Sequence, residues 1–151
     1  MDSLHKEEYA LDALMPLIRE RLAAGQSVRF SPRGTSMLPL IREGKDSVIL
    51  SPLPEKLKKY DLPLYQRKNG AYVLHRIVKT GACYTCIGDN QFQKEPGVDR
   101  GQMIALVTGV VRDGKTWDVK SFSYWLYCRW WHFSRPIRHL RFRWRARRGR
   151  Q

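Results

Sequence analysis

One serine in this chain stands in a loop setting that suits nucleophilic chemistry. Ser36 lies in the run Gly34-Thr-Ser-Met-Leu-Pro39, in a loop that precedes the strand expected over 47–50. A serine in a tight glycine-containing loop can expose its hydroxyl and leave backbone N–H groups free for an oxyanion, which is what acyl transfer requires. Serine is inert near neutral pH without a base, so a partner is needed elsewhere. Taken alone, the loop favours a serine that only caps its own turn.

A histidine and two aspartates further along the chain could complete such a site. His75 interrupts the apolar β-type run from Tyr72 to Val78, and Asp89 and Asp99 follow near the next expected turns. Histidine can act as the base for a serine, and a carboxylate can fix its tautomer and stabilise its charged form. A nearby carboxylate would also raise the pKa of His75 above its ordinary value of about 6.5. These residue types predict a Ser-His-Asp hydrolase site.

The motifs around these residues occur in a definite order along the chain. They are G-x-S-M-x-P at 34–39, G-x-D-x-V at 44–48, H-R-I-V at 75–78, G-D-N at 88–90 and D-R at 99–100, before an apolar strand that contains Gly109. Over about Val28 to Val111 the set resembles the S24/S26 peptidase clan, which holds type I signal peptidases and LexA-type self-cleaving repressors. His75 stands where most bacterial members carry a lysine, and it is similar in this to the endoplasmic-reticulum type.

The resemblance implies a serine endopeptidase that cleaves a specific peptide or protein substrate and needs no cofactor or metal. Ser36 would be the nucleophile and His75 its general base. Asp99 would be the orienting acid and Asp89 a supporting acid, although the sequence alone leaves the order of the two open. The same resemblance gives the oxyanion loop to Gly34 and Thr35, and contacts with the substrate to Met37 and Pro39.

Several departures from the clan leave alternatives open. Gly34 replaces the hydroxyl residue that secretory signal peptidases often carry, and Gln91 replaces the asparagine that usually follows Asn90. Lys79 lies on the same expected strand face as His75 and could serve as the base instead. The alternatives are a catalytically inactive peptide-binding or regulatory relative, and a peripheral membrane or nucleic-acid-binding module on an inert scaffold.

The pattern of elements predicts a mainly β fold, α+β overall. The resemblance implies a small coiled β-barrel like that of signal peptidases and LexA, and the residue pattern adds an N-terminal helix and a C-terminal amphipathic basic helix. Apolar periodicity predicts a helix over 4–24, which Pro16 would kink or divide, and Pro63 would place its strand at an edge or a bulge. Expected strands are 27–30, 47–50, 62–66, 72–78, 84–87, 103–111 and 116–119. Expected domains are the helix 1–26, the peptidase β-domain 27–120 and an aromatic, basic tail 121–151.

The tail holds much of the positive charge. Nine of the 28 Lys and Arg residues lie in 121–151, and none of the 14 Asp and Glu residues does. We expect a helix over about 124–133 that breaks near Pro136, and either peripheral binding to an anionic membrane surface or plain packing on the barrel. Nucleic acid is the less favoured partner, because no helix-turn-helix or other DNA-recognition motif precedes the tail. The expected membrane-binding residues are Trp125, Trp130, Trp131, Arg135 and Arg138.

Composition and cysteine usage narrow the class further. With 151 residues, 42% of them hydrophobic, the chain fits one globular domain. Three cysteines argue against a disulfide framework, and Cys83 and Cys86 would point to opposite faces of a strand instead of sharing a metal. The acidic start lacks a signal-peptide pattern, and no apolar run reaches the ~18 to 20 residues that cross a bilayer. We therefore expect a cytoplasmic location or a peripheral one on the cytoplasmic membrane face.

Overall fold

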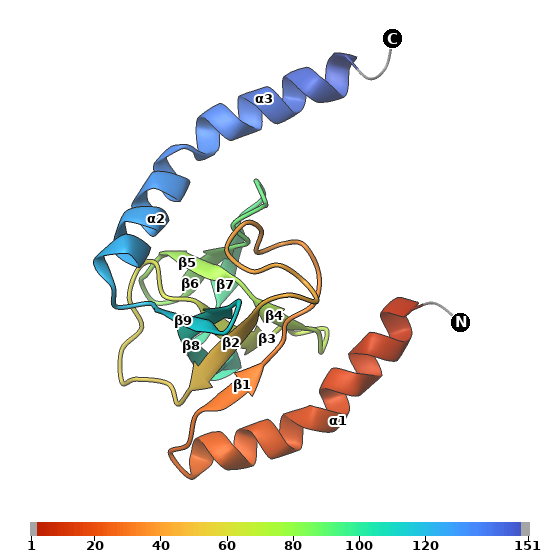
Figure 1. Ribbon diagram of the computed structural model, residues 1–151, viewed down its shortest axis with the longest axis vertical. Coiled ribbons are helices and arrows are strands. Elements are labelled where there is room, and N and C mark those ends of the chain that lie inside the picture. Colours follow the sequence, from red (N-terminus) through yellow and green to blue (C-terminus); the bar gives the residue numbers. More distant parts are fainter. Residues whose placement is uncertain (1–2, 149–151) are drawn as a thin grey trace.

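The computed structural model describes residues 3–148, with side chains from residue 11 onward. Over this range the chain is an α+β protein with three α-helices and two antiparallel sheets. The sheets form the body, and the helices lie at opposite sides of it (Figure 1). The sheets do not close into one barrel, so the closed barrel implied by the resemblance is wrong for this chain.

The larger sheet has six strands, and β8 (Met103–Arg112) is central to it. β8 pairs along one side with β2 (Ser47–Ser51) and along the other with β3 (Pro63–Gln66) and β9 (Lys115–Asp118). β1 (Val28–Phe30) extends the sheet beyond β2, and β4 (Tyr72–Leu74) extends it beyond β3. Because β8 is apolar and buried along most of its length, it suits a position with neighbours on both sides.

The smaller sheet has three strands in the order β5 (Arg76–Lys79), β6 (Tyr84–Ile87) and β7 (Glu95–Val98). β4 and β5 are two parts of the single strand expected over 72–78, and the chain changes sheet between them, at His75. This change leaves the strands in two separate sheets. The sequence does not predict β7, because Pro96 and Gly97 are typical of turns. Pairing with β6 overrides that local preference.

Two clusters of buried apolar side chains hold the body together. The larger cluster joins the larger sheet to helix α1 (Ser3–Ala23) and to the loop after β1. The smaller cluster lies between the two sheets and contains Tyr65 from β3, Met103 from β8 and Ile77 from β5. These contacts place the corner at His75 next to a packed interior.

For each of two prolines the structure contradicts one of the expected alternatives and supports the other. Pro16 lies inside α1, which continues through it as one helix, so the expected division is wrong, but the helix is bent partway along its length, in agreement with the expected kink (Figure 1). Met15, Ile18 and Leu22 pack against the sheet. Pro63 begins β3, which is an interior strand between β8 and β4, so the expected edge position is wrong. The alternative of a bulge is confirmed, because the register shifts between Leu64 and Tyr65.

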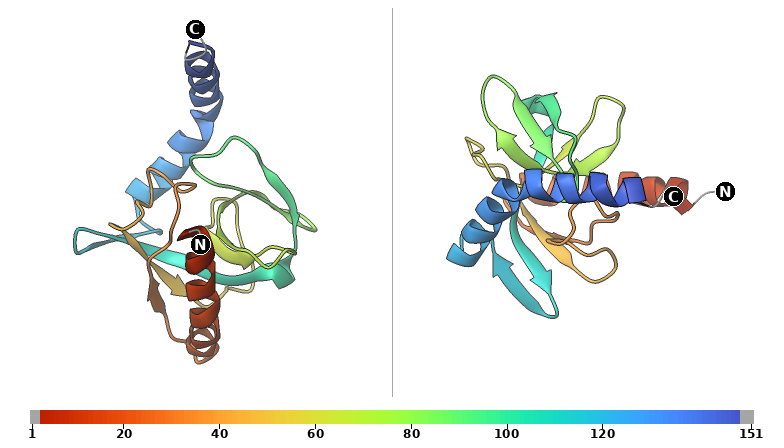
Figure 2. Two further views of the ribbon diagram at one scale, coloured as in Figure 1. Left: turned by 90° about the vertical axis from the view of Figure 1, so that its right-hand side faces the viewer. Right: turned by 90° about the horizontal axis from the view of Figure 1, so that it is seen from above.

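Helices α2 (Phe122–Phe133) and α3 (Arg135–Arg148) form a bent arm beside the body, and α3 projects away from the sheets (Figure 2). The Ser121 hydroxyl caps α2 by accepting a hydrogen bond from the backbone N–H of Tyr124. Pro136 is the second residue of α3, where a proline needs no backbone partner, so it helps to start this helix. Within residues 3–148 no helix combines the length and the apolar character that crossing a membrane requires.

Candidate active site

Ser36 lies in the loop that joins β1 to β2, and the loop is fixed to the body at both ends. Gly34 has a φ of +89°, a left-handed conformation that glycine adopts without strain. On the far side of Ser36, the side chains of Met37, Leu40 and Ile41 are buried in the larger core cluster. The Ser36 carbonyl accepts a hydrogen bond of 2.9 Å from the backbone N–H of Asn90. The backbone of Ser36 is therefore fixed in place, while the residue stays partly exposed.

A carboxylate from the G-x-D-x-V motif clamps the second half of this loop. The buried Asp46 side chain accepts hydrogen bonds from Arg42 at 2.8 and 2.9 Å and from Arg112 of β8 at 3.0 Å. Hydrogen bonds from both arginines hold the pKa of Asp46 well below its usual range. Arg112 also donates to the carbonyl groups of Pro39 and Leu40. Asp46 thus has a structural role that positions the loop.

His75 lies at the corner between β4 and β5 and is buried, with 3% of its surface exposed. Its Nδ1 atom is 3.4 Å from the hydroxyl of Tyr65 and 3.8 Å from Oε2 of Glu95. The Tyr65 hydroxyl donates to that same Glu95 oxygen at 2.7 Å. Arg67 donates to both Glu95 oxygens at 2.9 Å. One nitrogen of the imidazole therefore faces a connected Tyr65–Glu95–Arg67 network.

The pKa of His75 is lowered to about 4 from its ordinary value, which corrects the expected upward shift. Burial is the main cause, because it penalises the charged imidazolium, and the positive charge of Arg67 adds to it. Glu95 and Asp89 act in the opposite direction but do not outweigh these two effects. His75 is therefore neutral at pH 7, the form that can accept a proton.

Ser36 and His75 line one cavity of about 220 Å³. Gly34 and Met37 come to this cavity from the serine loop, and Gln91 comes from the loop after β6. A second cavity, of about 600 Å³, is also lined by His75 and Gln91, together with Glu95 and Phe92. The imidazole thus borders the cavity of the serine and the cavity of the glutamate. This arrangement gives Glu95, which the sequence did not indicate, the place expected for an orienting acid.

Asp89 is fully buried but serves a different partner from the one expected. Its carboxylate forms two hydrogen bonds of 2.8 Å with Arg76, the residue after His75, and accepts a third of 2.8 Å from the Tyr127 hydroxyl of α2. Its carbonyl accepts a hydrogen bond of 2.6 Å from the Trp131 indole. Asp89 therefore fixes β5 to the arm and acts on His75 only through its charge.

Asp99 does not take the orienting position that the resemblance implied. It is exposed at the start of the short 3-10 helix η1 (Arg100–Gln102), where its backbone N–H donates to the Gln102 side chain. Its carboxylate accepts a hydrogen bond of 3.1 Å from the Cys83 thiol. Among the contacts of the described residues, Glu95 is the carboxylate that faces the imidazole of His75, and Asp99 has no contact with it.

The other residues expected at the site divide into those at the cavity and those away from it. Gly34 and Met37 line it, whereas Thr35 is exposed and its carbonyl accepts from the Asn90 side chain at 3.2 Å. Pro39 is exposed outside the cavity lining. Lys79, the alternative base, is exposed at the far end of β5 and is also absent from the lining. Within the described residues no group of three His, Cys, Asp or Glu side chains could hold a metal ion.

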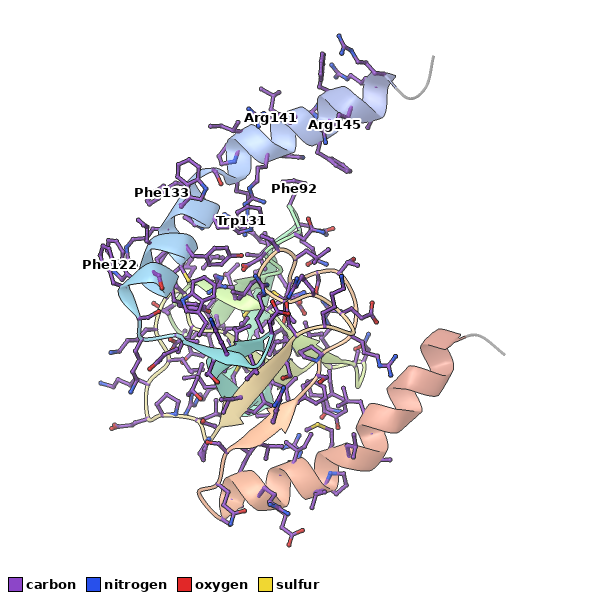
Figure 3. The ribbon with its side chains drawn as sticks, in the orientation of Figure 1. Phe92, Phe122, Trp131, Phe133, Arg141 and Arg145 are labelled. Carbon is purple, nitrogen blue, oxygen red and sulfur yellow. The ribbon has the colours of Figure 1, made fainter. Side chains whose placement is uncertain are left out.

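The expected membrane-binding residues face two different ways. Trp125 and Trp130 are exposed, with 45% and 69% of their surfaces accessible. Trp131 bonds to Asp89, Arg135 is buried, and Arg138 stacks on the Trp131 ring at 3.6 Å, so these three belong to the inner side of the arm. Figure 3 shows Trp131 on the side of α2 toward the body and Phe122 and Phe133 on the other side. The expectation that Trp131, Arg135 and Arg138 face lipid is therefore wrong.

Sequence reasoning missed Tyr65, Arg67 and Glu95. Each lies in a strand or turn whose local pattern carries no catalytic motif. The pairing of β3 with β4 places Tyr65 and the following Arg67 beside the corner at His75, and the pairing of β7 with β6 and of β6 with β5 brings Glu95 to the same corner. Comparison of the chain with protein-family models, with curated proteins and with solved structures found no significant match. The residues of the site are therefore the basis for inferring a function.

Proposed function

We propose that this protein is a serine endopeptidase in which Ser36 is the nucleophile and His75 the general base. The observation that carries the proposal is that both side chains line the same cavity and that the imidazole is buried and neutral. The motif order supports it independently, since the chain resembles the S24/S26 clan at both positions. A LexA-like arrangement of the β-domain belongs to the same proposal.

In this proposal the network at Nδ1 sets the tautomer of His75. The Tyr65 hydroxyl already donates a hydrogen bond to Glu95, so its oxygen is free to accept a hydrogen bond from the N–H of Nδ1. The proton then resides on Nδ1, and Nε2 carries the lone pair that can act as a base. Glu95, anchored by Arg67, would stabilise the positive charge that His75 gains in the transition state.

The reaction would proceed by acyl transfer. Nε2 takes the proton of the Ser36 hydroxyl as its oxygen attacks the carbonyl carbon of the peptide bond. The imidazolium then gives that proton to the leaving amine, and an ester of Ser36 remains. Water, deprotonated by the same nitrogen, hydrolyses the ester. Backbone N–H groups in the loop at Gly34–Ser36 are the candidates for holding the oxyanion.

A fluorophosphonate probe tests this chemistry without knowledge of the substrate. We expect the probe to label Ser36, and Ser36→Ala and His75→Ala to abolish labelling. Ser31→Ala, in the same loop, and His139→Ala, in α3, are the matched controls that should label normally. Intact-mass measurement reads out one adduct per chain. Labelling of another residue, or normal labelling of His75→Ala, would contradict the proposal.

Two observations favour a second candidate, an inactive peptide-binding relative. Gly34 supplies no hydroxyl to an oxyanion hole, and His75 has very little exposed surface. That candidate predicts no labelling of Ser36 and full biological activity of Ser36→Ala. For either candidate we propose a location in the cytoplasm or at the cytoplasmic membrane face.

A further inference from the structure

The arm of α2 and α3 has one side bound to the body. On α2, Tyr124 and Cys128 are buried, and Tyr127 and Trp131 bond to Asp89. On α3, His139 stacks on Phe92 with ring centroids 4.6 Å apart, and Phe142 lies 5.5 Å from the same ring. These contacts attach the arm to the loop after β6 at two places, one on each helix (Figure 3).

The opposite side of the arm carries a row of large apolar side chains. They recur every three or four residues, the spacing of one helix face, and every one is more than half exposed. Phe122, Trp130, Phe133 and Leu140 have about seven-tenths of their surfaces accessible, at 74%, 69%, 72% and 69%. We call this row the outer stripe; it contains Phe122, Leu126, Trp130, Phe133, Ile137, Leu140 and Trp144.

Arginine flanks the outer stripe and acids are absent from this part of the chain. The guanidinium of Arg129 lies 3.8 Å over the Trp125 ring, and that of Arg148 lies 3.5 Å over the Trp144 ring. Arg141, Arg143 and Arg145 are exposed on α3. Residues 121–151 contain no Asp or Glu that could neutralise these charges.

We propose that the outer stripe binds the surface of an anionic lipid bilayer, with the aromatic and aliphatic side chains at the headgroup level and the arginines on lipid phosphates. Aromatic rings and arginines are the side chains that favour this interface. The inference goes beyond the peptidase proposal and does not depend on it.

Two other occupants fit the stripe less well. A second copy of the arm would bring two arginine-rich helices together without opposing acids, and the rest of the chain also has more Lys and Arg than Asp and Glu. Nucleic acid would satisfy the arginines but leave the exposed Ile, Leu and Phe side chains of the stripe against water or phosphate. An anionic bilayer satisfies both features at once.

Vesicle sedimentation of the full chain tests the proposal. We expect binding to phosphatidylcholine vesicles that contain phosphatidylglycerol and little binding to phosphatidylcholine alone. Leu140→Glu should weaken binding at least about tenfold, because it removes apolar burial and adds a negative charge. The matched control is Leu17→Glu, at a half-exposed position of α1, which should bind normally.

The arginines are tested separately. Arg141→Gln should weaken vesicle binding about fivefold, and Lys115→Gln in β9 should not weaken it.

Further measurements make each outcome decisive. Bromine-labelled lipid chains should quench tryptophan fluorescence on binding. If Leu140→Glu does not fold, Ile137→Ser is the replacement variant, and it should reduce this quenching. Absence of vesicle binding, or equal binding by Leu140→Glu and Leu17→Glu, would overturn the proposal. A dimer in light scattering that Leu140→Glu abolishes would assign the stripe to a second copy. Ser36→Ala should bind vesicles normally, so this result and the labelling result can fail separately.

Discussion

At the scale of single residues, the unusual feature is a histidine whose nearest carboxylate does not determine its protonation state. Glu95 lies 3.8 Å from Nδ1, yet burial and Arg67 keep the pKa of His75 at about 4. Arg67 lowers that pKa directly while holding Glu95 ionised through two hydrogen bonds. His75 is therefore kept unprotonated at neutral pH by the same group of residues that contacts its Nδ1 atom.

This balance predicts an unusual pH profile. A protonated His75 cannot accept the proton of Ser36, so labelling should persist from neutral pH to about pH 5 and fall as the pH approaches 4. A histidine at its ordinary pKa would lose reactivity near pH 6.5. The labelling rate constant measured from pH 3.5 to 8 decides between them, with unfolding followed by circular dichroism at each pH.

Glu95→Gln should change both the labelling rate of Ser36 and the pKa of His75. Removing the carboxylate takes away an interaction that raises the pKa of His75, so the acid limb should move to lower pH. The labelling rate should fall about 10- to 100-fold, less than complete loss of a general base would cause.

Nitrogen-15 NMR of His75 should show the proton on Nδ1 in the parent chain and a mixture of the two tautomers in Tyr65→Phe. An unchanged tautomer in Tyr65→Phe would remove Tyr65 from this role.

At the scale of elements, the segment Gly88–Phe92 connects the serine loop to the arm. Asn90 bonds to the Ser36 carbonyl on one side, while Asp89 and Phe92 contact α2 and α3 on the other. Gly88 lies so close to the serine loop that a Cβ there would be 2.6 Å from the Ser36 carbonyl oxygen. Glycine is required at this position by close approach of two backbones.

Gly88→Ala should therefore displace the serine loop. We expect destabilisation of about 1–3 kcal/mol and slower labelling of Ser36, because the clash involves backbone and not a flexible side-chain end. Gly101→Ala is the matched control, since a Cβ there meets nothing within 4 Å. Urea unfolding and the labelling rate measure the two effects. Equal behaviour of both variants would show that the loop can move freely.

At the scale of the whole molecule, Arg76 is the point where three parts of the chain meet. It is fully buried in β5, pairs with Asp89 at 2.8 Å and donates to the Tyr124 hydroxyl of α2 at 3.0 Å. The carboxylate compensates a guanidinium that burial would otherwise destabilise. The arm is therefore attached to the smaller sheet, which begins directly after His75.

Loss of this pair should be costly. Asp89→Ala leaves Arg76 buried without its counter-charge, so we expect destabilisation of about 3–5 kcal/mol. Asp99→Ala, at an exposed position, should cost less than about 1 kcal/mol and leave labelling intact. Thermal and urea unfolding of the two variants measure the difference. A large effect on labelling from Asp99→Ala, with stability unchanged, would return Asp99 to the orienting role.

Local pattern alone determined much of this protein. The runs that form β2, β6 and β8, the helix around Met15 and Ile18, and the loop that carries Ser36 follow from residue type and spacing. Such features depend on neighbours in sequence, and burial does not overturn them when the pattern is strong.

Only the tertiary structure decided which acid faces His75 and which side of the arm faces outward. Glu95 reaches the imidazole because β7 pairs with β6, and no local signal at Pro96 and Gly97 predicts that strand. Aromatic residues surround α2 on all sides, so Trp130 and Trp131 are adjacent in sequence yet one is exposed and the other bonds to Asp89. Both outcomes depend on packing between distant segments, whose register a sequence pattern does not encode.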